Sequence, residues 1–168
     1  MLLSLFALVF PVMLLIAAWC DLRSMLIPNW ISIVLALAFF PAAALAGLSL
    51  NQIGVHLAVG ACVLLVCATL FYIGVFGGGD AKLISAASLW TGLAAGANFA
   101  MATALAGGGL ALVLIVLRRL NVQSEAGWAK RLLNPAEGAP YAVAIAIGGL
   151  LAAPHAPILS SSLPGLSV

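Results

Sequence analysis

Residues 53–76 read IGVHLAVGACVLLVCATLFYIGVF, without one Lys, Arg, Asp or Glu, and GGGDAKL follows directly at residues 77–83. A helix rises about 1.5 Å per residue, so a run of roughly 20 residues crosses a hydrocarbon core of about 30 Å. The apolar residues are continuous rather than alternating, which disfavours a transmembrane barrel. The stretch therefore predicts a membrane-spanning helix that gives way to a glycine-rich segment and an aspartate.

The composition of the whole chain agrees with this prediction. Of its 168 residues, 65% are hydrophobic and only 6% are charged. So few charges cannot cover a water-facing surface, since about 25% of the residues of an ordinary soluble domain are charged. The high apolar content also excludes disorder, and a net charge of +2 gives no reason to expect a nucleic-acid partner. What remains is an integral membrane protein in contact with the lipid bilayer.

Dividing the chain by span length gives an all-α fold, a bundle of about six transmembrane helices in a single membrane-embedded domain over residues 1–168. The break between the fourth and fifth spans is the least marked, and we expect it at Gly96–Asn98. Without a break, residues 81–117 would form a helix of about 55 Å, too long for one crossing. The six spans are about Leu2–Cys20, Asn29–Leu48, Ile53–Phe76, Ala81–Ala97, Phe99–Leu117 and Ala139–Ala156. The first lacks a preceding Lys or Arg, so we expect a retained span rather than a signal peptide.

The charged residues lie only in alternate connections between these spans. They are Asp21 and Arg23, then Asp80 and Lys82, then Arg118, Arg119, Glu125, Lys130, Arg131 and Glu137. With six spans, all of these connections fall on one face of the membrane. The positive-inside rule predicts that this face is cytoplasmic and that both termini are outside.

Cysteine and histidine give no sign of a metal site or a cofactor. Cys20, Cys62 and Cys67 form no Cys-x-x-Cys pair, so neither a zinc site nor a disulfide framework is indicated. His56 and His155 are far apart on the predicted outer side, and we expect ordinary packing or surface roles for them.

Two aspartates stand out because both lie at the cytoplasmic ends of predicted spans. A carboxylate costs about 2.5–3.5 kcal/mol at the centre of a span and less towards the interface, so it is a functional candidate by default. A structural alternative for Asp80 is a cap on the helix that follows its glycines. Asp21 lies near the C-terminal end of its helix, where the dipole disfavours an anion. Pairing with Arg23 or Lys82 would offset that cost.

Two carboxyl groups that meet across a helix bundle can hydrolyse an amide. Close together they resist double ionisation and share a proton. The ionised group activates a water, while the protonated group donates to the carbonyl oxygen, without a metal or a cofactor. Glycines before Asp80 would let an extended substrate backbone approach the acid and pair with free main-chain groups.

Three segments resemble one family. Residues 21–29, DLRSMLIPN, resemble the first active-site motif of the type IV prepilin peptidases, and GGGDAKL at 77–83 resembles their G-x-G-D motif, which other intramembrane aspartyl proteases share. Residues 140–146, PYAVAIA, are similar to the Pro-Tyr-Gly-x-Ala-Ile-Ala stretch of the family's last span, with Ala142 in place of Gly. The chain lacks a segment with paired Cys-x-x-Cys motifs, so it resembles the compact, peptidase-only enzymes of Flp/tight-adherence pilus systems.

The resemblance implies a function and a set of site residues. Asp21 and Asp80 would be the catalytic pair, and Gly77 and Gly79 would shape the loop before Asp80. Lys82 and Asn29 would orient the site or the substrate, or act only as an interface anchor and a helix start. The implied substrate is a prepilin, with a short polar leader and a hydrophobic N-terminal helix, at the bacterial cytoplasmic membrane. A pilus assembly machinery is a further candidate partner, and no cofactor is implied.

Two other function classes remain open at this point. In a proton-coupled transporter, paired acids would relay protons through a cavity, but we see neither repeated halves nor broken helices near the midplane. In a noncatalytic membrane scaffold, the acids would only cap helices.

Overall fold

The structure is a computed structural model, and it describes residues 2–120, 122, 126–134 and 137–162. Glu125 lies outside the described residues. The described residues form helices and no strand, so the predicted all-α class is confirmed. The elements are α1 (Leu2–Ser24), α2 (Asn29–Leu45), α3 (Leu50–Tyr72), α4 (Gly78–Arg119), α5 (Gly127–Leu133), α6 (Tyr141–Ala152), a 3₁₀ turn (Ala153–His155) and α7 (Pro157–Ser160).

The helices have the lengths and compositions of membrane spans. Helices α1, α3 and α4 are long and apolar enough to cross a bilayer, and α2 and α6 are shorter apolar helices. The protein is therefore a multi-pass, all-α membrane protein. Helix α1 runs on to Ser24, past the expected end at Cys20, so Asp21 lies inside its last turns. Helix α2 ends earlier than expected, at Leu45.

Helix α4 comprises two halves that meet at a sharp break. The expected break at Gly96–Asn98 is wrong, because the break falls at Gly92, whose φ is 56° and ψ is −156°. Only glycine adopts this backbone conformation readily. A Cβ at Gly92 would lie 2.5 Å from Cε1 of His56, a buried residue of α3, so packing also requires a glycine there. At Gly96 a Cβ would meet nothing within 4 Å, and that glycine continues the helix.

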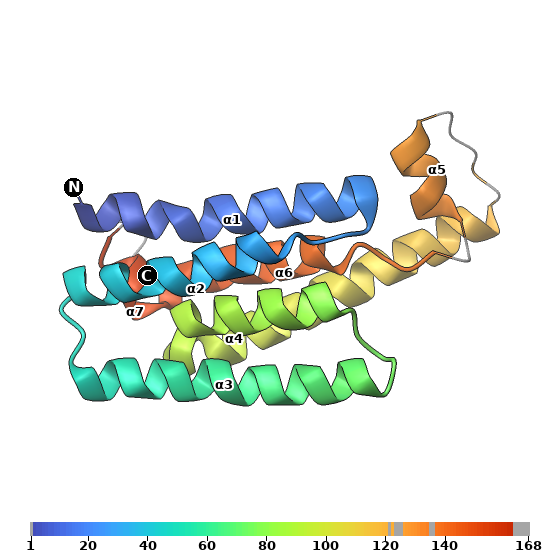
Figure 1. The fold of residues 1–168 in the computed structure, drawn as a ribbon. Helices are drawn as coiled ribbons and strands as arrows, with labels where there is room; N and C mark the ends of the chain where they lie inside the picture. Colours follow the sequence, from blue (N-terminus) through green and yellow to red (C-terminus); the bar gives the residue numbers. More distant parts are fainter. Residues whose placement is uncertain (1, 121, 123–125, 135–136, 163–168) are drawn as a thin grey trace.

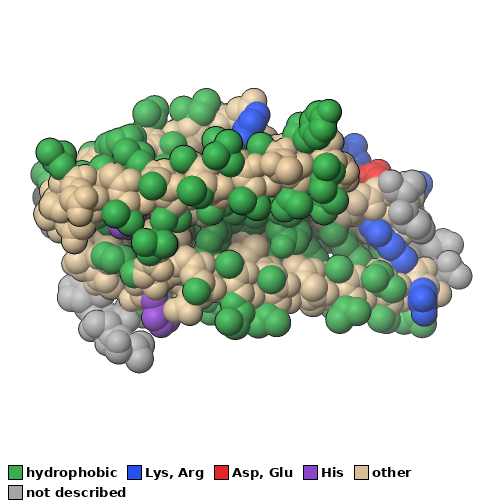
Figure 2. Space-filling view, turned by 90° about the horizontal axis from the view of Figure 1, so that it is seen from below, with side chains coloured by type: hydrophobic (Ala, Val, Ile, Leu, Met, Phe, Trp, Pro, Cys, Tyr) green, Lys and Arg blue, Asp and Glu red, His purple; other side chains and the backbone are tan. Residues whose placement is uncertain are grey.

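The break reverses the chain direction. The second half of α4 folds back beside the first half, so α1, α2, α3, the two halves of α4 and α6 run along one axis in alternating directions (Figure 1). Helices α1 and α3 finish at the end of the bundle where α2, α4 and α6 begin. We call this end the charged end, because the described charged residues belong to the element termini and connections there. The space-filling view shows most Lys and Arg side chains towards one end and hydrophobic side chains along the rest (Figure 2).

The core lies among α1, α2, α4 and α6. Phe10, Phe39 and Trp90 pack as an aromatic cluster, and Trp90 Nε1 donates to the carbonyl oxygen of Leu35 at 3.0 Å. Helix α6 packs mainly on α4 and α1. After α6, the short helix α7 buries Ile158 at the end of the bundle opposite the charged end. Helix α3 packs mainly on α4.

Candidate active site

Asp21 is buried at the charged end, with 6% of its surface exposed. Its Oδ2 accepts a hydrogen bond of 3.0 Å from the backbone N–H of Ala142, 121 residues away in sequence. Ala142 is the second residue of α6, where backbone N–H groups have no partner within the helix and the dipole favours an anion. The start of α6 therefore stabilises a carboxylate that the end of its own helix α1 disfavours.

The ion pairs considered for Asp21 do not form. The guanidinium of Arg23 lies over the ring of Trp19, with its Cζ 4.4 Å from the ring centroid. Lys82 Nζ donates to Asn29 Oδ1 at 2.9 Å. A main-chain N–H, rather than a cation, is the partner of Asp21.

Asp80 lies in the first turn of α4, after the three glycines. The N-cap of α4 is Gly77, and it makes no side-chain cap hydrogen bond. Asp80 Oδ2 turns back towards Gly77, where a Cβ would lie 2.7 Å from it. Oδ1 is buried and has no hydrogen-bond partner among the described residues. Asp80 is an acid in the first turn, where its charge suits the helix dipole, so the capping alternative stays open beside the catalytic one.

The two carboxyl groups lie close enough for the charge of Asp21 to act on Asp80. Asp21 is held by a backbone donor, and Asp80 keeps a buried oxygen that has no donor among the described residues. A buried polar atom without a partner is costly, and functional sites are one place where it persists. The arrangement leaves Oδ1 of Asp80 available for a water, a proton or a substrate group.

The glycines give the site its close packing. A Cβ at Gly79 would lie 3.1 Å from Cβ of Ile27, in the segment between α1 and α2. Gly79 therefore allows the segment that follows Asp21 to pack against the start of α4. Pro28 is the N-cap of α2, so it stands where this segment ends and the helix begins.

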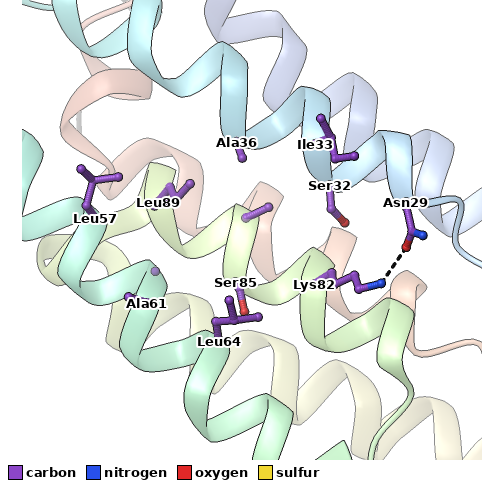
Figure 3. Close-up of a pocket in the computed structure, with 12 residues that line it drawn as sticks. Asn29, Ser32, Ile33, Ala36, Leu57, Ala61, Leu64, Lys82, Ser85 and Leu89 are labelled. Atoms are coloured by element: carbon purple, nitrogen blue, oxygen red, sulfur yellow. Dashed lines mark hydrogen bonds between the residues drawn. The ribbon is translucent and has the colours of Figure 1, made fainter.

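Lys82 and Asn29 join the starts of α4 and α2. Their hydrogen bond lies at one end of a cavity of about 540 Å³ between α2, α3 and α4 (Figure 3). Both residues are exposed, and Ser32 Oγ, which lines the same cavity, is buried without a hydrogen-bond partner among the described residues. The structure thus places all six candidate residues at the charged end.

Three groups that sequence reasoning did not assign belong to this site. They are the N–H of Ala142 and the rings of Tyr141 and Phe76. The charge of Asp80 acts on Tyr141, whose ring meets that of Phe76 at 5.2 Å and 75°. A Cβ at Gly107 would lie 2.6 Å from the Tyr141 ring, so this glycine makes room for it. The signal was present in the segment PYAVAIA, to which no role had been given.

Ala142 stands where the resembling sequences have Gly. This difference leaves the hydrogen bond from Ala142 to Asp21 intact, because the donor is the main-chain N–H. The side chain of Ala142 is fully buried. Within residues 2–120, 122, 126–134 and 137–162, no three His, Cys, Asp or Glu residues form a group that could hold a metal ion.

A comparison with known proteins identifies the family of the chain. The model of the type IV leader peptidase family matches residues 8–112, which include Asp21 and Asp80 and end before the segment 140–146. No curated protein and no solved structure gives a significant match. Because the family model covers more than half of the sequence, the chain belongs to the type IV leader peptidase family.

Proposed function

We propose that the protein is a prepilin leader peptidase that uses Asp21 and Asp80 as an aspartyl dyad. The family supports a leader peptidase role in general. The observation that supports the finer proposal is that both aspartates lie at the charged end, near enough for the charge of Asp21 to act on Asp80. Asp21 is held by the start of α6, and Asp80 has a buried oxygen without a partner in the part of the chain that the structure describes.

In the proposed reaction the pair holds one proton. The ionised carboxylate takes a proton from a water, which attacks the carbonyl carbon of the peptide bond, and the protonated carboxyl group donates to the carbonyl oxygen. The C–N bond then breaks as the first carboxyl group gives its new proton to the leaving nitrogen, while the second takes a proton back from the tetrahedral intermediate. The pair again holds one proton. The unpartnered Oδ1 of Asp80 is the atom best placed to bind that water or that oxygen. The hydrogen bond from Ala142 keeps Asp21 in one orientation throughout.

The proposed substrate is a type IV prepilin of the Flp-like kind, cut between its leader and its hydrophobic N-terminal helix. That junction lies at the surface of the bacterial cytoplasmic membrane, and the positive-inside rule supports a cytoplasmic position for the charged end. The absence of Cys-x-x-Cys motifs from the sequence supports a peptidase without methyltransferase activity.

The test is co-expression with a tagged prepilin, comparing the wild type with Asp21→Asn and Asp80→Asn. The wild type should shorten the precursor, and each substitution should slow cleavage by at least about 100-fold, as expected for loss of an acid–base group. Glu137→Gln is the matched control, because it makes the same chemical change before α6, and it should cleave normally.

Membrane fractionation shows whether each variant is inserted. Normal processing by an inserted Asn variant would rule out the dyad. A wild type that leaves the precursor intact would favour the scaffold, and proton or solute flux that depends on both acids would favour the transporter.

A further inference from the structure

A second cavity, of about 550 Å³, lies between α3 and both halves of α4. We call it the α3–α4 groove. Its lining is largely apolar and includes Val63, Cys67 and Leu70 of α3 and Phe99, Ala100 and Ala104 of α4. Seen from the α3 side, the molecule is hollowed along its length (Figure 2).

One end of the groove lies near the candidate catalytic acid Asp80. At 3.6 residues per turn, Asp80 shares one face of α4 with three residues that line the groove: Ile84, Ser88 and Thr91. The charged end of the groove is lined by Tyr141, on which the charge of Asp80 acts. Asp80 itself does not line the groove, but it lies about one helical turn before Ile84, which lines the charged end of the groove.

The cavity between α2, α3 and α4 lies on a different face of α4. Lys82, Ser85 and Leu89 line it from α4 (Figure 3). At 3.6 residues per turn, these three residues lie on the opposite face of the helix from Asp80. Its polar end is the hydrogen bond between Lys82 and Asn29. A third cavity beside α3, of about 180 Å³, is lined from α4 by Leu93 and Ala94, which follow the break. Of these three cavities, the α3–α4 groove is the one whose lining shares a face of α4 with Asp80.

The groove suits one side of an apolar helix. One helical turn about 10 Å wide and 5.4 Å long fills about 420 Å³, so the groove holds little more than a turn, or the side chains from one face of a longer helix. Helix α3 buries only His56, Gly60 and Cys67 among its described residues, so most of its surface is free of contacts within the chain. An occupant can therefore reach the groove sideways from the bilayer.

We propose that the α3–α4 groove binds the hydrophobic helix of the prepilin substrate. The inference rests on the proposed function. A helix lying in the groove places its cytoplasmic end beside Phe76 and Tyr141, and the peptide bond just before that helix then meets Asp80. The apolar lining matches this occupant, and a groove that ends next to a candidate catalytic acid fits a substrate helix better than a lipid chain.

The first test fills the groove. Ala100→Trp and Ala104→Trp place a large ring at exposed lining positions of α4, while the control Ala61→Trp places the same ring at an exposed position of α3 that lines the cavity between α2, α3 and α4. With purified enzyme and prepilin, both groove variants should raise KM about tenfold or more, whereas Ala61→Trp should leave it within about twofold. If both groove variants kept the wild-type KM, or if only Ala61→Trp raised KM, the proposal that the groove binds the prepilin helix would be wrong.

The second test detects binding without cleavage and remains decisive if a Trp variant fails to insert. A benzophenone amino acid is placed at position 100 or 61 of the full chain carrying Asp80→Asn, in membranes that contain the prepilin. We expect a crosslink to the prepilin's hydrophobic helix from position 100 and none from position 61. Adducts at position 100 only with lipid or with a second copy of the enzyme would overturn the groove.

These outcomes separate the two proposals. If the wild type cleaves and the Asp variants do not, but position 100 fails to crosslink, the groove is wrong and the peptidase proposal stands. If the prepilin crosslinks at position 100 while Asp80→Asn cleaves it normally, the groove stands and the dyad is wrong.

Discussion

Gly77 has no side chain, and this leaves room for the carboxylate of Asp80. Its backbone, with φ of −74° and ψ of 139°, is one that any residue can adopt. The constraint on this position comes instead from the 2.7 Å that would separate a Cβ from Asp80 Oδ2. A methyl group at position 77 would therefore displace the carboxylate while leaving the backbone of the loop unstrained.

We predict that Gly77→Ala lowers prepilin cleavage by about tenfold or more, because a displacement of about 1 Å at a reacting group is costly. Gly96→Ala is the matched control, because it adds the same methyl group where nothing lies within 4 Å. Precursor processing in cells, with membrane-inserted enzyme measured in parallel, checks both variants. Equal loss of activity in the two would show that a general effect of added bulk, rather than contact with Asp80, is responsible.

Asp21 marks the limit of residue-level prediction. The sequence predicted its position at the end of the first span and its candidacy as a catalytic group. It could not predict the N–H of Ala142 as its partner, because that bond joins two segments 121 residues apart and uses no side chain of α6. The catalytic role of both acids stays a prediction.

At the scale of elements, the spans could be predicted from apolar length, and the break in α4 could be predicted to exist but was misplaced. Gly92 and Gly96 look equivalent in sequence, since each is a glycine within an apolar run. They differ in their tertiary contacts. The ring of His56 packs against Gly92, and Nδ1 of His56 lies 2.6 Å from the carbonyl oxygen of Leu89. A contact with α3 therefore decides where α4 turns.

We predict that Gly92→Ala destabilises the helical bundle by about 2 kcal/mol or more, since a non-glycine residue in this backbone region costs about 1–3 kcal/mol before any clash with His56. Thermal unfolding in detergent measures the effect. The control Gly96→Ala should unfold at or slightly above the wild-type temperature, because alanine favours a helix over glycine. A wild-type midpoint for Gly92→Ala would mean that α4 does not turn at this residue.

At the scale of the whole molecule, the break in α4 determines which residues share a membrane face. Without a reversal at Gly92, the second half of α4 would carry Arg118 and Arg119 away from Arg23 and Lys82. With the reversal, these four residues lie at one end together with Lys130 and Arg131 of α5. Arg118 also donates to the carbonyl oxygens of Leu132, Glu137 and Gly138, so it holds together the connection between α5 and α6.

This distribution predicts the orientation of the protein. Lys and Arg near the ends of spans are retained on the cytoplasmic side, and the connection at residues 46–49 has none. We expect a phosphatase that is active only outside the cytoplasm to work when fused after residue 48 and to fail after residue 25 or residue 138. A reporter that fluoresces only in the cytoplasm should give the reverse pattern. Fusions that placed residues 25 and 77 on opposite sides would separate the two aspartates by the membrane, and no rearrangement of side chains could then bring them together.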